Sequence, residues 1–317
     1  MQLPIYLDNN STTKCDPRVF EAMTPYFLED YGNAASRSHA YGWKTEEGVD
    51  YAREQIAKII GANSKEIIFT SGATESNNLA LKGVYEMYAA KGNHFITVST
   101  EHKAILDACK HLEKLGAEVT YLPVAEDGLV TIEQIEDAIK PNTVLVSVMY
   151  ANNELGVIQP IREIGALCKE KGILFHTDAT QAVGKIPVSV LDDNIDLLSF
   201  TAHKMYGPKG VGALYVRRKN PRVKVTAQID GGGHERGMRS GTLNVPGIVG
   251  FGKACEIAMA EMDADAERLS KMRDRLENAL LKLEEAYVNG TKDHRLPHTT
   301  NISFKYVEGE GLMMGIK

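Results

Sequence analysis

"TVLVSVMYANNELGVIQPIREIGALCKEKGILFHTDA", residues 143–179, decides the fold class of this chain. It begins with an apolar, β-branched run at 143–150, which is typical of a buried strand. The apolar residues of 161–171 have helical spacing, and 172–179 is again an apolar run. A strand, a helix and a second strand in this order predict a βαβ unit, in which the two strands are parallel.

The same alternation continues on both sides of this segment. The apolar pattern predicts further strands at 66–70, 94–100, 118–124 and 195–202, and helices at 73–90, from about 103, and at 131–139. Repeated βαβ units build a mainly parallel sheet that is covered by helices. The pattern therefore indicates an α/β fold, in which ligands bind at the carboxyl ends of the strands.

The pattern changes beyond Gly241. A long helix is predicted from 246 to about 287, with a stripe of apolar residues at Leu269, Met272, Leu276, Leu280 and Leu283. We expect this helix to connect the sheet to a second, α+β unit, to which 299–307 supplies a strand. The N-terminal "MQLPIYLDNN" is interpreted as a short strand.

The composition is that of an ordinary globular protein, with 317 residues, of which 43% are hydrophobic and 25% charged. The net charge of −6 disfavours non-specific binding to nucleic acids or anionic membranes, which uses a basic surface. No apolar stretch reaches the length of a membrane span, and the N-terminus lacks the features of a signal peptide. Neither a metal site nor a disulfide framework is expected, because no CxxC pair occurs among Cys15, Cys109, Cys168 and Cys255. A reducing compartment fits this pattern best.

Polar side chains follow five successive predicted strands. The segments after these strands read "TSGATESNN", "TEHK", "ANNELG", "DATQ" and "TAHK". Because the carboxyl ends of parallel strands meet at one edge of a sheet, we expect these polar groups to form a single site.

The segment "SGATE", residues 71–75, is a candidate anion site. The free N–H groups at the start of the following helix would bind an anion, and Gly72 allows a close approach. The alternative is a plain helix cap formed by Ser71 or Thr74. Nucleotide cofactors are not expected, because the chain has no P-loop and Arg236 in "GGGHERG" occupies the place of the last glycine of a dinucleotide motif.

Asp178 and Lys204 are the two charged residues at the ends of apolar strands. A poorly solvated carboxylate at 178 needs a partner, and a helix N-cap or an ion pair is the alternative interpretation. Lys204 precedes a glycine-rich turn; a desolvated lysine can form a Schiff base, whereas an ordinary surface lysine is the alternative. An anion site, a carboxylate and such a lysine together predict pyridoxal phosphate (PLP) as cofactor.

Eight segments of the chain resemble the cysteine desulfurases of iron–sulfur cluster assembly, in the class V aminotransferase superfamily. They run from Leu3 to about Gly311 and read "YLDNNSTT", "YGNAASRSHAYG", "FTSGATESNNLA", "TEHKAILD", "NNELGVIQP", "HTDATQAVGK", "TAHKMYGPKGVGALYVR" and "GGGHERGMRSGTLNVP". The resemblance implies the PLP fold-type I architecture: a mainly parallel seven-stranded sheet with flanking helices and a smaller α+β domain. The large domain would span 15–258, and the small domain would contain 1–14 and 259–317.

The resemblance also implies a role for individual residues. Lys204 would bind PLP covalently, and His102 would stack on the pyridine ring and exchange protons with Lys204. Asp178 would pair with the pyridinium nitrogen, and Gln181 with the phenolate oxygen. The other contacts would come from Ala73, Thr74, Thr201 and His203 to the phosphate, from Thr242 to the phosphate of the neighbouring subunit, and from Asn153 to the phenolate and the substrate carboxylate. Thr201 stands where many relatives have serine, which keeps the hydroxyl group.

The activity implied is conversion of L-cysteine to L-alanine and an enzyme-bound persulfide. The partners implied are a second copy in a homodimer, an iron–sulfur scaffold protein and other sulfur acceptors, without membrane or direct nucleic-acid contact. The setting would be the cytoplasm, or an organellar matrix after loss of a transit peptide. The alternatives are another class V enzyme, such as a selenocysteine lyase or an aminotransferase, and a non-catalytic module that keeps the dimer and scaffold surfaces.

The chain departs from the family at its C-terminal end, "YVEGEGLMMGIK". Family members continue for several dozen residues, which hold the mobile loop with the nucleophilic cysteine and the arginine that binds the substrate carboxylate. None of the four cysteines matches that loop. The expectation is therefore a truncated chain that forms little or no alanine and sulfide by itself.

Overall fold

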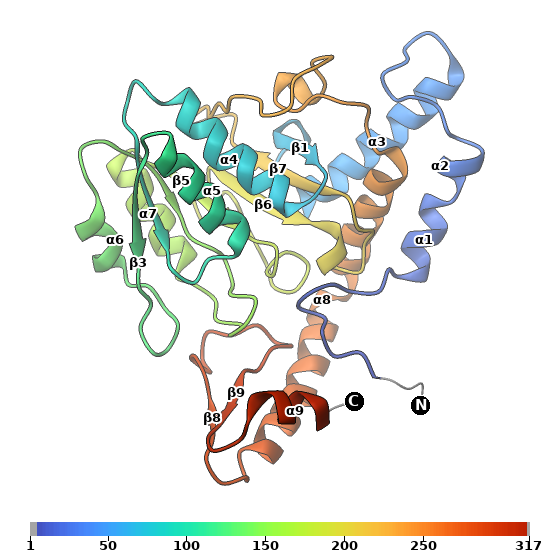
Figure 1. The fold of residues 1–317 in the computed structure, drawn as a ribbon. Coiled ribbons are helices and arrows are strands. Elements are labelled where there is room, and N and C mark those ends of the chain that lie inside the picture. The colour runs from blue at the N-terminus through green and yellow to red at the C-terminus, as the bar shows by residue number, and fades with distance from the viewer. Residues whose placement is uncertain (1–4, 316–317) are drawn as a thin grey trace.

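A seven-stranded sheet forms the centre of the computed structural model, which describes residues 5–315 (Figure 1). The strand order is β1-β7-β6-β5-β4-β2-β3. The strands are β1 (Ile67–Thr70), β2 (His94–Val98), β3 (Glu118–Leu122), β4 (Thr143–Ser147), β5 (Leu174–Asp178), β6 (Leu197–Thr201) and β7 (Gly212–Val216). Only β7 is antiparallel to its neighbours, β1 and β6. The predicted mainly parallel sheet of seven strands is confirmed.

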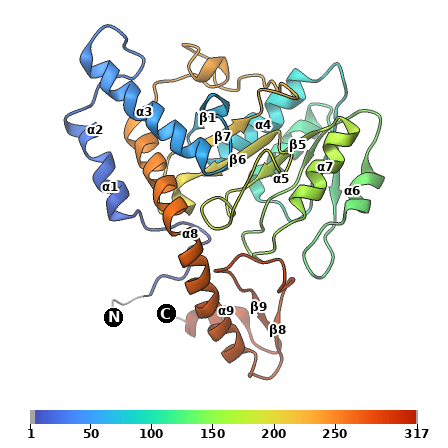
Figure 2. The same ribbon diagram turned by 180° about the vertical axis from the view of Figure 1, so that it is seen from behind.

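Helices cover both faces of this sheet (Figures 1 and 2). Helices α4 (Ala73–Met87) and α5 (Lys103–Lys114) pack on one face, and α3 (Ala40–Lys58), α6 (Ile132–Ala138), α7 (Ile161–Lys171) and part of α8 (Val245–Leu280) pack on the other. Neighbouring residues of a strand belong to different cores: Ile67 and Phe69 to one, Ile68 to the other. Strands β1, β2, β5, β6 and β7 are therefore buried at every position, because both of their sides are covered.

Two short helices, α1 (Pro17–Met23) and α2 (Pro25–Leu28), precede α3. The long helix α8 extends from the sheet to a smaller unit at the bottom of Figure 1. That unit contains an antiparallel pair, β8 (Ala286–Val288) and β9 (Ile302–Phe304), and helix α9 (Gly309–Gly315). The domain boundary expected at 258/259 lies inside α8 and stays a prediction.

Two of the secondary-structure predictions were wrong. The long helix ends at Leu280 and not near 287, because Tyr287 pairs with Ser303 in the small sheet and Glu285 has a positive φ. Residues 5–8 are exposed and form no strand, and residues 1–4 lie outside the described part. Within residues 5–315, no helix combines the length and the apolar character needed to cross a bilayer.

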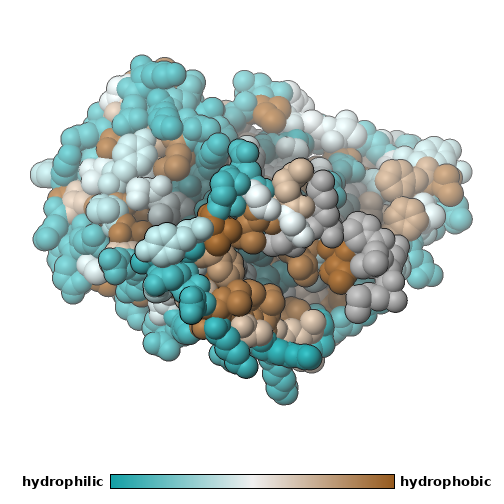
Figure 3. All heavy atoms as spheres, turned by 60° about the horizontal axis from the view of Figure 1, so that its bottom comes forward, coloured by the Kyte–Doolittle hydropathy of each residue, from teal (hydrophilic) through white to brown (hydrophobic). Residues whose placement is uncertain are grey.

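The lower end of the molecule has an apolar surface, as Figure 3 shows. Large apolar side chains of α8 and α9 are exposed in the smaller unit: Met272, Leu276, Met313 and Met314. Part of the predicted apolar stripe of the long helix is therefore on the surface. A contiguous patch of this kind is typical of a contact surface rather than of scattered single residues.

Candidate active site

A cavity of about 960 Å³ opens at the carboxyl ends of the sheet strands. Its walls come from the turns after β1, β2, β4, β5 and β6 and from the N-terminal segment 8–12. The site residues predicted from the sequence that line it are Ala73, Thr74, His102, Asn153, Asp178, Gln181, Thr201, His203 and Lys204. Thr242 is not among the lining residues; it is exposed on the loop before α8.

Lys204 follows β6 at the end of a single 3₁₀ turn, Ala202–Lys204. Its Nζ donates a hydrogen bond to the carbonyl oxygen of Asn10, which also accepts from Gln181 Nε2 at 2.9 Å. Burial lowers the pKa of Lys204, although Asp178 and Asp8 act in the opposite direction. The amine of Lys204 therefore loses its proton more readily than that of a surface lysine, which makes it a better nucleophile.

Asp178 lies at the end of β5 with only 6% of its surface exposed. Its Oδ2 accepts a hydrogen bond from Asn77 Nδ2 at 2.7 Å, and its Oδ1 accepts from the N–H of Thr180 at 3.0 Å. No lysine or arginine among residues 5–315 forms an ion pair with Asp178. The carboxyl group is therefore positioned by neutral donors at the wall of the cavity.

Asn77 and Glu101 support the site, and neither was predicted from the sequence. Glu101 is buried at the end of β2, where its Oε1 accepts from the N–H of Met149 at 2.5 Å. Burial, and secondarily Asp178, raises the pKa of Glu101 well above its usual range. Neither residue stands out in the sequence, because Asn77 lies in the polar run 74–78 and Glu101 in the polar run 99–103.

His102 is the N-cap of α5. Its Nδ1 accepts a hydrogen bond from the N–H of Ala104 at 3.1 Å. Because Nδ1 is the acceptor, the proton of a neutral ring sits on Nε2. The side chain lines the cavity and is otherwise exposed, so Nε2 is accessible to a ligand.

The start of α4 has no side-chain cap. Gly72 is the N-cap, and neither Ser71 nor Thr74 accepts from the first N–H groups through its side chain, so the alternative of a plain cap by one of them is wrong. Gly72 has φ +157°, and a Cβ placed there would project towards Thr201 Oγ1 at 3.9 Å. The first N–H groups of the helix therefore face the cavity with the positive end of the helix dipole.

His203 and Thr201 lie near the start of α4 and carry an imidazole and a hydroxyl group. Burial and the charges of Lys204 and Lys209 lower the pKa of His203 to about 4, so its ring is neutral at pH 7. His203 Nδ1 lies 3.1 Å from Thr12 Oγ1. The hydroxyl of Thr201 donates to the carbonyl of Val211 at 2.9 Å, which leaves its oxygen without a proton for an anion. The role of Thr201 as a phosphate donor stays a prediction.

The two asparagines after β4 have different environments. Asn152 is buried, and its Oδ1 accepts from the N–H groups of Glu154 and Leu155, which shapes the turn. Asn153 lines the cavity, and its backbone carbonyl accepts from Asn10 Nδ2 at 3.1 Å. Its side chain is therefore the one available to a ligand.

None of the four cysteines lines the cavity. Cys109, Cys168 and Cys255 are buried, and burial raises the pKa of all three thiols, to about 12 for Cys109. We expect a maleimide to modify Cys15 alone in the native protein, because it is the one thiol of the four that is not buried, although partial burial and Asp16 raise its pKa as well. Mass spectrometry of the native and denatured protein would count the labels, and fast labelling of a Cys15→Ser variant would contradict this prediction.

A model of the family described as aminotransferase class-V matches residues 5–316. A cysteine desulfurase IscS of Anaeromyxobacter sp. (strain K) is 59% identical over 318 residues, which cover 100% of this chain and 78% of that protein. A cysteine desulfurase IscS of Shewanella sp. (strain MR-4) is 56% identical over 319 residues, which cover 100% of this chain and 79% of that protein.

Solved structures have the same fold. A NifS-like protein superposes with a TM-score of 0.93 at 43% identity and covers 97% of this chain and 84% of its own. A structure described as SspA in complex with cysteine has a TM-score of 0.87 at 38% identity. The match covers 98% of this chain and 87% of that one. Both the sequence and the fold of this chain are therefore similar to those of proteins that carry these names.

Proposed function

This chain belongs to the class-V aminotransferase family, and we propose that it is a cysteine desulfurase that uses PLP to convert L-cysteine into L-alanine. The observation that carries the proposal is the cavity in which Lys204, Asp178 and the free start of α4 meet. The identity of 59% to a protein named cysteine desulfurase favours this activity over that of a selenocysteine lyase or an aminotransferase. The sulfur would pass through a persulfide to iron–sulfur cluster assembly.

The described residues fit PLP. The start of α4 offers N–H groups to a phosphate, and the buried carboxylate of Asp178 suits a protonated ring nitrogen. Asn77 Oδ1 is buried without a hydrogen-bond partner among residues 5–315 and also needs a donor. A cavity of about 960 Å³ has room for the cofactor and a small amino acid together.

PLP, when bound, supplies an aromatic electron sink that stabilises negative charge at the Cα of the substrate. Asp178 favours a proton on a ring nitrogen placed against it, because its carboxylate is negative and poorly solvated. Gln181 Nε2 and the side chain of Asn153 are the amides that would orient the ring oxygen and the substrate carboxylate.

Two groups in the cavity would move protons. The lowered pKa of Lys204 suits its amine to take a proton from Cα and to return it near neutral pH. In a neutral His102 ring the proton is on Nε2, and this nitrogen would donate it to the substrate. None of Cys15, Cys109, Cys168 and Cys255 is assigned as the sulfur acceptor, because none lines the cavity.

A homodimer is part of the proposal. Large aromatic and aliphatic side chains are exposed along α1, α2 and α3 and the loops between them: Phe20, Phe27, Leu28, Tyr31, Tyr41, Trp43 and Tyr51. Aromatic residues are enriched in the cores of protein interfaces. An exposed Thr242 that lies outside the cavity is consistent with a contact to the phosphate of a neighbouring subunit. We propose the cytoplasm as the setting and a scaffold protein and other sulfur acceptors as partners.

Covalent labelling tests the proposed function. We expect the purified protein to be yellow and borohydride to fix the cofactor on the peptide that contains Lys204, because this amine has a lowered pKa and faces the cavity. Peptide mapping by mass spectrometry is the measurement. Lys209, which also lines the cavity but is exposed, is the matched control. A label on Lys209, or no label on Lys204, would refute the assignment.

A further inference from the structure

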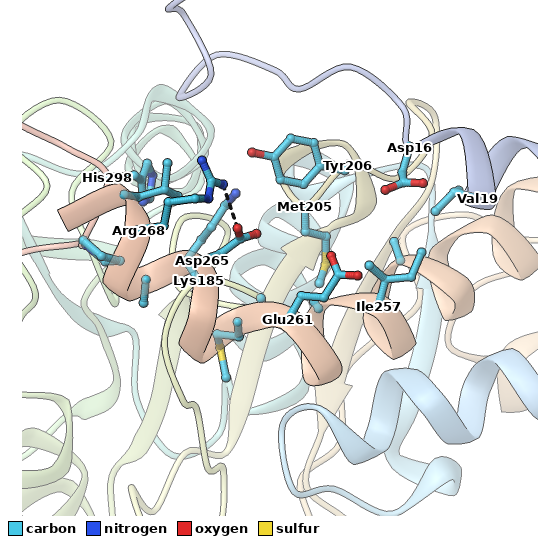
Figure 4. Close-up of a pocket in the computed structure, with 17 residues that line it drawn as sticks. Asp16, Val19, Lys185, Met205, Tyr206, Ile257, Glu261, Asp265, Arg268 and His298 are labelled. Atoms are coloured by element: carbon cyan, nitrogen blue, oxygen red, sulfur yellow. Dashed lines mark hydrogen bonds and ion pairs between the residues drawn. The ribbon is translucent and has the colours of Figure 1, made fainter. Parts of the chain in front are cut away.

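A second cavity, of about 330 Å³, is lined by the two residues that follow Lys204 in the chain, Met205 and Tyr206 (Figure 4). His203 and Lys204 line the first cavity, whereas Met205 and Tyr206 line the second, which we call the rear cavity. None of residues 5–315 lines both cavities. The remaining walls of the rear cavity come from α8, the turn after β5, the start of α1 and residues 297–298 of the smaller unit.

The acidic side chains of the rear cavity already have partners. Arg18 bonds to Asp16 at 2.8 Å and to Glu261 at 2.5 Å. Asp265 accepts from Arg268 at 2.7 Å, and Figure 4 shows this pair beside Lys185. These carboxylates are therefore neutralised by arginines and are not counter-ions for a further cation.

Lys185 is a cation without such a partner. Among residues 5–315, no carboxylate lies within 4.0 Å of its Nζ, and its Nζ makes no hydrogen bond. The Nζ instead lies 4.5 Å from the centroid of the Tyr206 ring. Burial lowers the pKa of Lys185 to about 8, with Asp265 acting weakly in the other direction. Lys185 is partly buried, and a partly desolvated ammonium without a counter-ion is unfavourable, so this site favours the arrival of an anion.

His298 adds a second unpartnered group to the same end of the rear cavity. Its Nδ1 is buried and has no hydrogen-bond partner among the described residues. Burial, together with the charges of Lys185 and Arg273, lowers the pKa of His298 to about 4. The imidazole is therefore neutral at pH 7 and can donate or accept one hydrogen bond without adding a charge.

We propose that the rear cavity binds a small carboxylate, whose charged end is held by Lys185 and His298 and whose short tail packs against Met205 and Ile257. One uncompensated ammonium matches a single negative charge, such as that of a carboxylate. The apolar wall of Met205, Ile257 and Ala258 suits an alkyl tail. The proposal does not rest on the proposed function, because the two cavities share no residue.

Calorimetric titration of the purified protein with sodium propionate is the test. Propionamide, which has the same shape without the charge, and sodium chloride at equal ionic strength are the matched probes. We expect propionate to bind with a dissociation constant of about 1 mM, because a ligand of five heavy atoms gains at most a few kcal/mol. Propionamide should bind at least about tenfold more weakly, since it leaves Lys185 without a counter-ion.

Two substitutions locate the binding. Lys185→Met removes the charge and keeps the length of the side chain, and Lys185→Gln keeps a polar end if the first variant folds poorly. Each should weaken the binding of propionate at least about tenfold. Lys219→Met, the same change at an exposed lysine, should leave the affinity for propionate unchanged. Equal affinity of wild type and both Lys185 variants, equal binding of propionamide, or no binding by wild type up to about 50 mM overturns the proposal.

The pH dependence gives a readout that a structural role of Lys185 would not produce. The groups that face Lys185 are Asp265, Glu261 and Arg268 of α8, Tyr206, His298 and Asp16. We expect propionate affinity to fall as the pH rises from about 7 to about 9.5, because Lys185 loses its charge through a pKa of about 8. Affinity that is independent of pH in this range would count against Lys185 as the anion ligand.

Discussion

Asp178→Asn is expected to slow exchange of the substrate Cα proton by about a hundredfold to a thousandfold, with some cofactor still bound. The substitution keeps the shape of the side chain and removes its negative charge. In the wild type, Asn77 Nδ2 donates to Asp178 Oδ2 at 2.7 Å, and the variant would place an amide group opposite this donor. Without the carboxylate, no buried anion remains to favour a proton on the ring nitrogen. The measurement is the rate at which the Cα proton of L-alanine is replaced by deuterium in deuterium oxide, with the variant and the wild type at matched cofactor occupancy.

Asn77→Ala separates the charge of Asp178 from its position. This variant removes one donor to the carboxylate but leaves the charge and the bond from the Thr180 N–H. We expect the exchange rate of the substrate Cα proton to fall by about tenfold, which is the effect of removing one hydrogen bond to a charged group. If Asp178→Asn exchanges at the wild-type rate, the carboxylate is not the partner of the ring nitrogen. If Asn77→Ala is as slow as Asp178→Asn, position and not charge is decisive.

The sheet and the location of the site could be predicted from the sequence because both depend on local patterns. Apolar runs that alternate with helical periods require strands covered on two faces, and Ile67, Ile68 and Phe69 are indeed buried in alternating cores. The carboxyl ends of parallel strands meet at one edge, so polar residues at strand ends come together in one cavity. Lys204 and Asp178 were found in this way.

The supporting contacts could not be predicted, because they join segments that are distant in the sequence. The carbonyl of Asn10 accepts from Gln181 and Lys204 only after the N-terminal segment crosses the sheet edge. The surroundings of Lys185 form only when α8 and residues 297–298 of the smaller unit pack against the turn after β5. Sequence spacing holds no information about such contacts until the helices are packed.

Glu235→Ala is expected to lower the free energy of unfolding by about 3–5 kcal/mol, which is the effect of removing one partner of a buried ion pair. Glu235 accepts from Arg53 Nη1 at 2.7 Å, from Arg53 Nη2 at 2.8 Å and from the N–H of Phe69 at 2.9 Å. The side chains of Arg53 and Glu235 are 8% and 4% exposed. The substitution would leave a guanidinium and a backbone N–H buried without this partner.

Chemical unfolding of this variant should be compared with that of Glu267→Ala. Glu267 pairs with Lys271 on the exposed face of α8, where both side chains are about 70% exposed, so its loss should change the unfolding free energy by less than about 0.5 kcal/mol. Equal midpoints for Glu235→Ala and the wild type would show that the buried pair adds no stability.

The same substitution should also weaken cofactor binding, because Glu235 anchors the loop beside the site. Glu235 bonds to the N–H of Phe69 in β1, the strand that leads into the proposed phosphate site at Gly72. In the same loop, Arg239 Nε bonds at 2.8 Å to Glu75, in the first turn of α4. Loss of the anchor therefore loosens both sides of the helix start. A spectroscopic titration with PLP should give a dissociation constant raised about tenfold in Glu235→Ala and unchanged in Glu267→Ala; a wild-type value would restrict Glu235 to a role in stability.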